Sequence, residues 1–395
     1  MSWNVTALKR ALQVEGRTSG LIKGEVAEEP SQGLYPGFSA SGQDVWLQQA
    51  QFSGPGLILS AVGARCGKVF ESPADREWGT VANTVVLLPR PGYDAHFLWY
   101  LVNNEDFWEK GGAAQPYVRV AETLERRLPL PPFHIQRAIA DYLDAETARI
   151  DALIEKKQRL GALLQERRQA LISQAILRNR DPGAATRGDA VGVDWRRLKH
   201  FCSVTCEYGV NVSSDDYASE GIRLIRTTDV NEDGTLTGPD GAVFIDPAFA
   251  DGKLLSTGDL LFSRSGTIGR CLLFQEAASP CTFAGYLVRF RVRPDVDPRY
   301  VAYCSKANFF TDQIKSDAIE STISNFNAEK YGNVRLPWWT GGDQRVIADY
   351  LDRETARIDG LIERIGSQTR LLQEHRQTLI TAAVTGELEV PGVAA

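Results

Sequence analysis

The sequence contains one long segment twice. Residues 136–155 read QRAIADYLDAETARIDALIE and residues 344–363 read QRVIADYLDRETARIDGLIE, with 17 of the 20 positions identical. The spacing of 208 residues continues without a gap as far as Ile176 and Val384. It is much longer than the roughly 20–50 residues of a solenoid repeat. The chain is therefore expected to consist of two copies of one half-protein, with internal pseudo-two-fold symmetry.

Similar patterns also recur upstream of the two copies. In each half an apolar run leads into a small polar segment, then a second glycine with a basic residue, and later an aromatic-rich segment that reads as a helix. The corresponding pairs are Ser60–Gly63 with Ser263–Gly266, Gly67-Lys68 with Gly269-Arg270, and 97–104 with 300–307. The predicted order is a variable region, a long helix, a second variable region and a second long helix.

The repeated segments are predicted to be long helices near 135–178 and 343–384. They lack proline and are rich in residues that favour helix. Stepping through the first copy by three and four residues predicts a heptad seam that includes Leu153, Lys157 and Leu160. Because such a helix cannot bury its apolar stripe alone, its copy is the expected partner, in an antiparallel pair within the chain.

Bulk composition limits the class of protein. The chain has 395 residues, 43% of them hydrophobic and 24% charged, as in a globular protein of two or three domains. It has no apolar run of membrane-spanning length and no signal-peptide pattern, so no membrane partner is expected. Six cysteines without a CxxC pair favour a reduced, cytoplasmic protein. The net charge of −6 hides basic clusters, among them Arg289, Arg291 and Arg293.

At this point the sequence resembles the specificity subunits of type I restriction–modification systems. The resemblance is carried by the two QR-x-IADYLD-x-ETARID-x-LIE segments, the string LLFSRSGTIGR, the LPLPP junction at 128–132 and the VTGELEV ending. Together these features span nearly the whole chain. The halves also differ, because AVGARCG in the first is one residue longer than RSGTIG in the second, and the second junction reads LPWWTGGD.

The resemblance implies a fold of two α/β (mixed α+β) target-recognition domains joined by a pair of long antiparallel coiled-coil helices. Four segments are expected: target-recognition domain 1, a long spacer helix, target-recognition domain 2 with a linker, and a second long helix with the C-terminal tail. Their predicted bounds are 1–132, 133–180, 181–342 and 343–395.

The resemblance also implies partners. These are double-stranded DNA with a bipartite asymmetric site, two methyltransferase subunits, and restriction subunits that join through the methyltransferases. The chain itself is expected to be non-catalytic, with no cofactor and no metal. S-adenosylmethionine, ATP and Mg²⁺ are implied for the partner subunits alone. The target sequence, the spacer length and the methylated base cannot be inferred from the sequence.

Basic and polar residues in the variable regions are the candidates for DNA contact. Arginine pairs well with guanine edges, and most contacts in such interfaces go to phosphate. The alternative for these loops is a β-corner that only shapes the domain, and the alternating arginines near position 225 could simply face solvent. The candidates are Arg65, Lys68, Arg223, Arg226, Arg264, Ser265, Thr267 and Arg270.

Exposed positions at the starts of the two helices are the candidates for subunit docking. These are Arg137 and Asp141 in the first copy and Arg345 and Asp349 in the second. The alternative is that the identical stretch reflects the contact between the two helices.

The sequence supports a catalytic role less well than it supports DNA recognition. The chain has no NPP[YF] or DPPY string and no GxGxxG motif. Gly63 to Lys68 has the wrong spacing for a phosphate loop and is better explained as a turn between strands. Pro239-Asp240 followed by Asp251-Gly252-Lys253 matches a loose PD…DxK nuclease pattern that could hold Mg²⁺. A coiled-coil scaffold without a DNA role is a further alternative. A metal site at His200, Cys202 and Cys206 matches no common zinc spacing.

Overall fold

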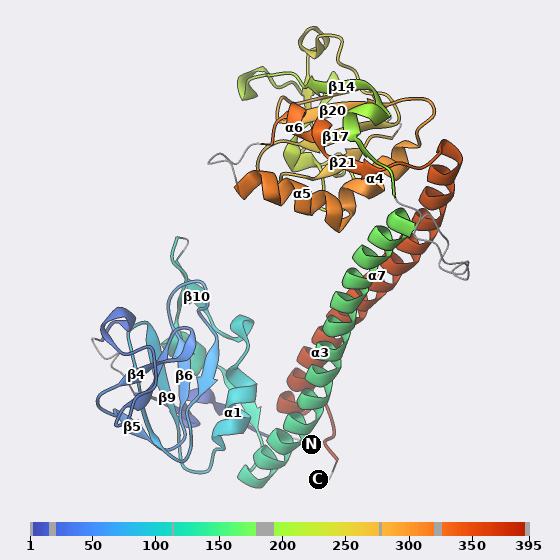
Figure 1. Cartoon of the computed structure of the whole chain (residues 1–395). Coiled ribbons are helices and arrows are strands. Elements are labelled where there is room, and N and C mark those ends of the chain that lie inside the picture. The colour runs from blue at the N-terminus through green and yellow to red at the C-terminus, as the bar shows by residue number, and fades with distance from the viewer. Residues whose placement is uncertain are drawn as a thin grey trace. The chain divides into compact units, whose positions relative to one another are not determined.

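The computed structural model describes residues 3–15, 21–112, 114–178, 193–275, 279–319 and 326–391. Contacts between Cα atoms divide the chain into a first unit, Met1–Gln158 with Ser367–Ala395, and a second unit, Arg159–Gly366. Each unit holds a domain of mixed strands and helices and a part of each long helix (Figure 1). The expected fold class is confirmed. The four predicted segment bounds stay a prediction, and the linker expected after position 180 falls at 179–192, outside the described residues.

The two predicted long helices are α3 (Phe133–Arg178) and α7 (Gly341–Thr385), of 46 and 45 residues. The hydroxyl of Thr340 caps α7, because it accepts a hydrogen bond from the Asp343 amide at 3.3 Å and donates to the Asp343 carboxylate at 2.6 Å. Gly386 follows α7 with a φ of 79°, the left-handed conformation in which helices commonly end. Neither these helices nor any other in the described ranges combines the length and apolar composition of a membrane span.

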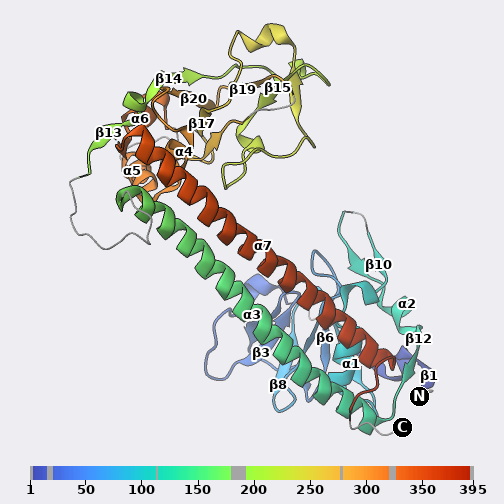
Figure 2. The same cartoon turned by 90° about the vertical axis from the view of Figure 1, so that its right-hand side faces the viewer.

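Within each unit, α3 and α7 lie side by side and antiparallel (Figure 2). In the first unit, Arg376 of α7 donates to Asp151 of α3 at 2.9 Å. In the second unit, Arg168 of α3 forms an ion pair with Asp359 of α7 at 2.7 Å. Each pair joins the same two positions of the repeat, with the helices exchanged. The antiparallel pairing of the two copies within one chain is therefore confirmed.

The seam between the helices differs from the prediction at two leucines. Leu153 and Leu160 were expected in it, but they are 41% and 49% exposed. The seam instead contains Gly161, where an added Cβ atom would lie 3.8 Å from Ile365 of the opposite helix. Glycine is a poor helix former and an unlikely seam residue by sequence. An added Cβ atom there would make only an ordinary contact. Leu143 of the predicted row is fully buried, so the predicted seam is wrong at Leu153 and Leu160 and not along its whole length.

A four-stranded antiparallel sheet occurs once in each unit with the same strand order. The orders are β2-β9-β6-β7 and β14-β20-β17-β18. The first sheet contains β2 (Leu12–Glu15), β6 (Leu57–Ser60), β7 (Val69–Glu71) and β9 (Thr84–Pro89). The second contains β14 (Cys202–Tyr208), β17 (Asp259–Ser263), β18 (Cys271–Leu273) and β20 (Leu287–Val292). The duplication therefore extends through the variable regions.

A second sheet also corresponds, with a parallel pair next to an antiparallel pair, in the orders β4-β3-β8-β5 and β16-β15-β19. Its strands are β3 (Tyr35–Ser39), β4 (Gly42–Leu47), β5 (Phe52–Ser53), β8 (Glu77–Thr80), β15 (Ile222–Ile225), β16 (Val243–Ile245) and β19 (Cys281–Phe283). Two-stranded ribbons are β1 (Asn4–Ala7) with β12 (Arg127–Leu130), β10 (Lys110–Gly111) with β11 (Tyr117–Val118), and β13 (Trp195–Arg197) with β21 (Arg335–Pro337). The short helices are α1 (Ala95–Val102), α2 (Val120–Leu124), α4 (Pro298–Lys306), α5 (Asn308–Ile319) and α6 (Ala328–Asn333).

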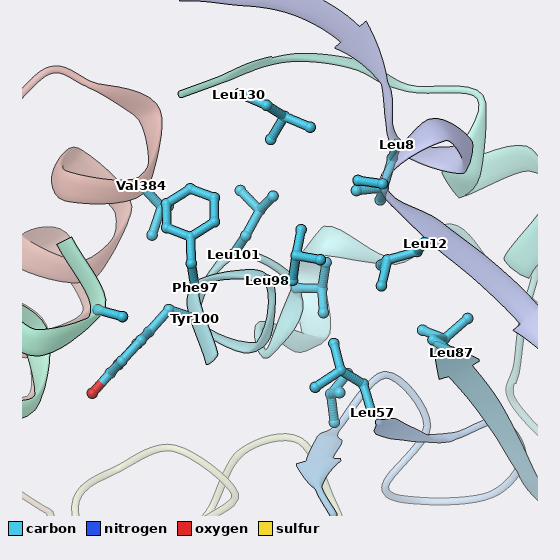
Figure 3. Packing of buried hydrophobic residues seen from close by; sticks show 14 of the residues in the cluster. Leu8, Leu12, Leu57, Leu87, Phe97, Leu98, Tyr100, Leu101, Leu130 and Val384 are labelled. Carbon is cyan, nitrogen blue, oxygen red and sulfur yellow. The ribbon is translucent and has the colours of Figure 1, made fainter. Parts of the chain in front are cut away.

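The core of each domain includes the start of one long helix and the end of the other. In the first unit, Leu143 of α3 and Val384 of α7 belong to the same buried cluster as Phe97 of α1 (Figure 3). In the second unit, Leu351 of α7 and Ile176 of α3 belong to the cluster around α4. The main buried cluster of each domain therefore includes the ends of both long helices, and smaller clusters lie around the second sheet.

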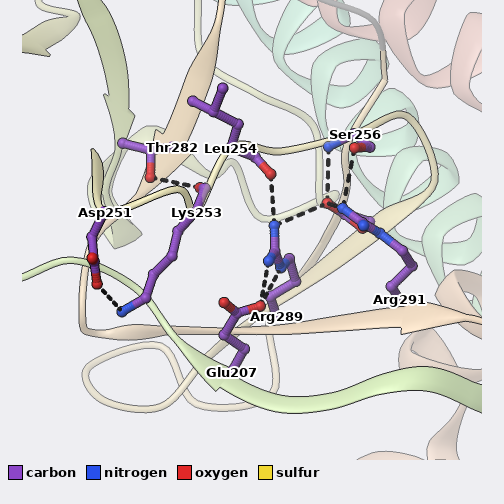
Figure 4. A network of polar contacts seen from close by, with 9 residues as sticks. Glu207, Asp251, Lys253, Leu254, Ser256, Thr282, Arg289 and Arg291 are labelled. Atoms are coloured by element: carbon purple, nitrogen blue, oxygen red, sulfur yellow. Dashed lines mark hydrogen bonds and ion pairs between the residues drawn. The ribbon is translucent and has the colours of Figure 1, made fainter. Parts of the chain in front are cut away.

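A buried carboxylate organises the main sheet of the second unit (Figure 4). Asp259 is fully buried and accepts hydrogen bonds from the Ser256 amide at 2.9 Å and from Arg291 at 2.6 and 2.8 Å. Arg289, which is nearly buried, donates to the Leu254 carbonyl at 2.7 Å and pairs with Glu207. The arginines of this sheet thus satisfy charges inside the unit.

The basic cluster of Arg289, Arg291 and Arg293 is consequently not a patch of unneutralised charge. Arg293 also forms an ion pair, with Asp295 at 3.0 Å, and donates to the His200 carbonyl at 2.7 Å. The sequence shows three alternating cations in a strand, whereas their acidic partners come from other strands and turns.

We expect Asp259→Ala to destabilise the second unit by about 3–5 kcal/mol, because it leaves buried arginine charge without its partner. Asp295→Ala, which breaks the exposed pair with Arg293, should change stability little. Hydrogen exchange of the β17 and β20 amides measures both effects. Equal protection of these strands in the two variants would contradict the assigned role of Asp259.

Candidate nucleic-acid interface and helix joints

Six of the eight predicted DNA-binding residues lie in two corresponding hairpin loops. The first loop joins β6 to β7 and the second joins β17 to β18, and both strand pairs are antiparallel. The same bond closes both loops: Ser60 N donates to Lys68 O at 2.8 Å, and Ser263 N donates to Arg270 O at 2.9 Å. The two loops are therefore one structural feature with different sequences.

Glycine shapes both loops just before their final basic residue. Gly67 and Gly269 have φ values of 99° and 91°, which disfavour residues with a Cβ atom. The segment from Gly63 to Lys68 connects two strands and is not followed by a helix. Its interpretation as a turn between strands is confirmed.

The two candidates in the first loop are exposed. The Arg65 guanidinium lies 3.4 Å from the Ser41 carbonyl oxygen, a long hydrogen bond at the surface. The Lys68 ammonium lies 5.5 Å from the centre of the Phe70 ring. Both cations remain accessible, as contacts with phosphate require.

The candidates in the second loop are held more firmly. The Arg264 guanidinium lies 4.9 Å from the ring centre of Tyr208 on β14. Arg270 is turned inward and donates to the Val230 carbonyl at 2.6 Å. The Ser265 carbonyl accepts from the hydroxyl of Ser263 at 3.0 Å, and Thr267 is exposed at the tip of the loop.

Arg223 and Arg226 lie away from the hairpin, at the second sheet. Arg223 donates to the carbonyls of Thr237 and Gly238 at 3.0 and 3.3 Å. Arg226 binds both carboxylate oxygens of Asp229 at 2.8 to 3.0 Å, and this contact raises its pKa above the ordinary value. Both arginines thus hold the loops that follow β15, a role that their alternation in the sequence does not reveal.

The four docking candidates are all exposed on the first turns of the long helices. Arg137 and Asp141 lie on α3, and Arg345 and Asp349 on α7. Asp349 also forms an ion pair with Arg299 of α4 at 2.8 Å. Arg345 lines a cavity of about 800 Å³ beside the start of α4. The alternative of a helix–helix contact at these positions is not supported, because the side chains are on the outside.

Sequence reasoning missed a buried glutamine that occurs in both repeats. The amide of Gln136 accepts from Asp94 N at 2.8 Å and donates to the Pro131 carbonyl at 2.8 Å. Gln344 repeats this arrangement with Asp297 N at 3.1 Å and the Trp339 carbonyl at 2.8 Å. Each glutamine therefore ties the start of a domain helix to the start of a long helix.

A tyrosine joint accounts for further identical positions. The Tyr100 hydroxyl donates to Asp144 at 2.8 Å and lies 3.3 Å from the Thr147 hydroxyl. In the second unit Tyr303 contacts Asp352 at 2.7 Å and Thr355 at 3.2 Å. The aspartate and threonine of the repeated LDxET string thus orient each domain on its helix. The signal was present as identity, but the tyrosine partners are visible only in three dimensions.

The two joints differ in one cation. In the first unit, His96 contacts Glu71 at 2.8 Å and Asp144 at 2.7 Å, and the hydrogen bond with Glu71 is the main cause that raises its pKa from 6.5 to about 9. At the corresponding position of the second unit stands Arg299, which pairs with Asp352 at 2.7 Å. The first joint therefore contains a group with a pKa of about 9, whereas the guanidinium in the second joint has a raised pKa and stays protonated.

The nuclease pattern has no metal-binding arrangement around it. Asp251 has a left-handed backbone at the end of a turn, and its carboxylate lies 3.6 Å from the Lys253 ammonium. Among the residues that the structure describes, no three His, Cys, Asp or Glu side chains form a cluster that could hold a metal ion. Cys202 and Cys206 instead donate to the carbonyls of Leu198 and Ala328.

Comparison with known proteins shows which proteins are similar to this chain in sequence and in fold. No protein-family model matches the chain. The specificity subunit of the type I restriction enzyme StySPI from Salmonella potsdam is 23% identical over 186 residues, which cover 46% of this chain and 39% of that protein. The EcoKI specificity subunit from Escherichia coli is 22% identical over 186 residues, which again cover 46% of this chain and 39% of that protein. The matched stretch thus spans less than half of these curated relatives.

Solved structures match over almost the full chain. A structure solved for the assembly and conformational transition of a type I restriction–modification system has a TM-score of 0.75 at 16% identity and covers 98% of both chains. The chain is similar in sequence and in fold to type I specificity subunits. The HsdS subunit from Thermoanaerobacter tengcongensis has a TM-score of 0.54 at 18% identity, with 98% and 97% of the chains covered. The resemblance to type I specificity subunits that the sequence indicates is confirmed.

We expect the glutamine joints of this type I specificity-subunit fold to be energetically important. Gln136→Leu and Gln344→Leu each leave a buried amide and a buried carbonyl without a partner, at a cost of about 1–3 kcal/mol per group. Gln373→Leu, on the exposed face of α7, is the matched control. Thermal unfolding of the three variants tests this expectation, and a loss as small as that of the control would contradict it.

The His96 joint predicts a pH dependence confined to the first unit. The folded state raises the His96 pKa from 6.5 to about 9, so the folded chain binds the proton more tightly than the unfolded chain. The stabilisation is present below pH 6.5 and is lost as the pH rises from 6.5 through about 9. We expect the protection factors of the α1 amides, which are corrected for the pH dependence of intrinsic exchange, to fall across this window in the wild type and to be flat in His96→Asn, while those of α4 beside Arg299 stay unchanged. Parallel pH profiles for α1 in the two proteins would refute the assignment.

Proposed function

We propose that this chain is the DNA-specificity subunit of a type I restriction–modification complex. Each domain recognises one part of a bipartite, asymmetric site in double-stranded DNA. The chain carries no catalysis of its own and targets methyltransferase subunits to that site. It binds no cofactor, whereas S-adenosylmethionine serves the methyltransferases, and ATP and Mg²⁺ serve the restriction subunits that join them. The complex acts on DNA in the cytoplasm.

The observation that supports this proposal is that the same hairpin scaffold occurs in both domains but presents different side chains. The hairpin loops close with the same hydrogen bond, yet one presents Arg65 and Lys68 and the other presents Arg264 and Thr267. A duplicated scaffold with equal loops would favour two equal half-sites. Different loops on equal scaffolds favour two different half-sites, because base recognition depends on the side chains presented in the groove.

Electrostatics is compatible with this role despite the net charge of −6. Many arginines of the second unit are paired with carboxylates of the same unit, so these positive and negative charges neutralise each other within the fold. The hairpin loops retain accessible cations, which is what attraction to the phosphate backbone requires.

Docking of two methyltransferase subunits is supported by identity at exposed positions. Arg137 and Arg345, Asp141 and Asp349, and Arg149 with its copy at position 357 are identical and exposed in both repeats. Apart from the ion pair of Asp349 with Arg299, these side chains lie outside the domain core and the helix seam. Two equal exposed surfaces fit two copies of one partner, whereas a scaffold without partners would place no constraint on them.

Methylation mapping tests the proposed function directly. We expect methylated adenines in host DNA to lie in a split sequence motif that disappears when this gene is deleted. Exchange of residues 1–132 for the corresponding region of another specificity subunit should alter one half of the motif and leave the other. A change in both halves, or no change of methylation on deletion, would show that the assignment is wrong.

The proposed spacer role of the helices has its own test. Inserting one heptad at matched positions of α3 and α7 adds about 10 Å at 1.5 Å per residue, or about three base pairs. We expect the mapped motif to keep both halves and to gain unspecified base pairs between them. An insertion of seven residues in α3 alone breaks the matched register and serves as the control. An unchanged gap with matched insertions would exclude the spacer role.

A further inference from the structure

A cavity of about 460 Å³ in the second unit is lined by an excess of cations. It lies between α3, α4, α5, the turn at 232–234 and the β17–β18 hairpin loop. Its basic lining residues are Arg168, Arg270, Lys306 and Lys315, and its acidic ones are Glu232 and Asp233. Helices, a turn and the predicted DNA-binding loop thus converge on one cationic space.

Lys306, the last residue of α4, is a half-buried cation of this cavity. Among the residues that the structure describes, no carboxylate forms an ion pair with its ammonium within 4.0 Å, although Asp233 and Asp359 favour its charged form from a longer distance. The centre of the Tyr303 ring is 5.8 Å away. Its backbone carbonyl accepts a hydrogen bond from Gln169 of α3, which fixes the end of the helix at the cavity. Burial lowers the pKa of this lysine. A half-buried ammonium without a carboxylate in direct contact is stabilised by a ligand that supplies an anion at that place.

The other cations are only partly neutralised. Arg168 is paired with Asp359 at 2.7 Å. The nearest carboxylate to Arg270 is that of Glu232, at 4.0 Å and almost fully exposed, a weak partner. Lys315 is exposed at the rim. The cavity thus offers several donors to one anion.

The fold itself does not require this lysine. The corresponding position at the end of α1 in the first unit is Asn103, whose side-chain oxygen accepts from Val69 N at 3.1 Å. A neutral amide therefore completes the same helix end with a structural hydrogen bond. A lysine at this place in the second unit calls for a different explanation.

We propose that this cavity binds one phosphate group of the DNA backbone, with Lys306 as its principal contact. The inference rests on the proposed function and adds a site that it does not specify. The backbone of DNA is favoured as the source because Thr267 and Arg270 of the hairpin loop form one wall, so a strand contacted by the loop would present its phosphate to the cavity. The first unit has no lysine at the corresponding position, so the second domain contributes a positioning contact that the first lacks.

Salt-dependent DNA binding by the chain assembled with its methyltransferase subunits tests the proposal. The variants are Lys306→Met, the conservative Lys306→Arg, and Lys315→Ala at the exposed rim. Lys253→Met is the control, because that lysine is already next to Asp251. Each complex is titrated with a duplex that carries the mapped motif and with one of arbitrary sequence. Thermal unfolding confirms that each variant is folded.

We expect Lys306→Met to reduce the slope of log K against log salt by about 0.9, the contribution of one phosphate, with the same affinity loss for both duplexes. Lys306→Arg should retain the slope, Lys315→Ala should reduce it partially, and the control should match the wild type. A wild-type slope in folded Lys306→Met and in Lys315→Ala would overturn the phosphate site while leaving the proposed function intact. Absence of DNA binding by the wild-type complex would refute both.

A further experiment distinguishes a site for a free anion from a site for a phosphate of the DNA backbone. Inorganic phosphate is added to the wild type and to Lys306→Met in the absence of DNA, and the unfolding temperature is measured. Stabilisation of the wild type alone, together with unchanged DNA slopes, would identify a site for a free anion and overturn the proposal. Stabilisation together with the reduced DNA slope would support it.

Discussion

The attachment of each domain to the long helices is the interaction on which this structure depends. A single buried glutamine in each copy, Gln136 or Gln344, bonds to the backbone on both sides of the junction. Because both groups it satisfies are main-chain groups, the attachment does not depend on the side chains of the variable region. A tyrosine that contacts an aspartate and a threonine adds a second connection, again in both copies. Domains can therefore diverge in sequence while the way they are fixed to the helices stays the same.

This separation of roles has a functional consequence. The repeated segments hold the residues that the attachment and the helix pairing need, and the ion pairs of Asp151 with Arg376 and of Arg168 with Asp359 show that one set of residues serves twice. The hairpin loops differ between the halves in length and sequence. This arrangement is the basis of the proposed recognition of two unlike DNA segments by equivalent scaffolds. The chain is similar to type I specificity subunits.

The arginine and lysine side chains of this chain differ in how far their charges are neutralised. Arg289 and Arg291 form ion pairs with the buried Asp259. In contrast, Arg65 and Lys68 are exposed on a loop, and Lys306 lines a cavity. A buried arginine stabilises the fold because its partners are fixed, and an exposed or unneutralised one is available to phosphate. The net charge of the chain is therefore a poor guide to its nucleic-acid surface, since it sums cations of both kinds.

The amino-acid sequence alone established the duplication, the two long helices to within a few residues of each end, and the turn between strands that ends in Lys68. These features depend on local preference and on identity between copies, which a sequence displays directly. The three-dimensional fold settled which residues lie between the helices, because Gly161 faces Ile365 of the opposite helix whereas Leu160 is 49% exposed. It also settled which arginines are neutralised and that Lys306 lies half-buried beside a cavity with no carboxylate in direct contact among the described residues. Those outcomes depend on residues that are distant in the chain, and no spacing or periodicity records where a distant carboxylate will lie.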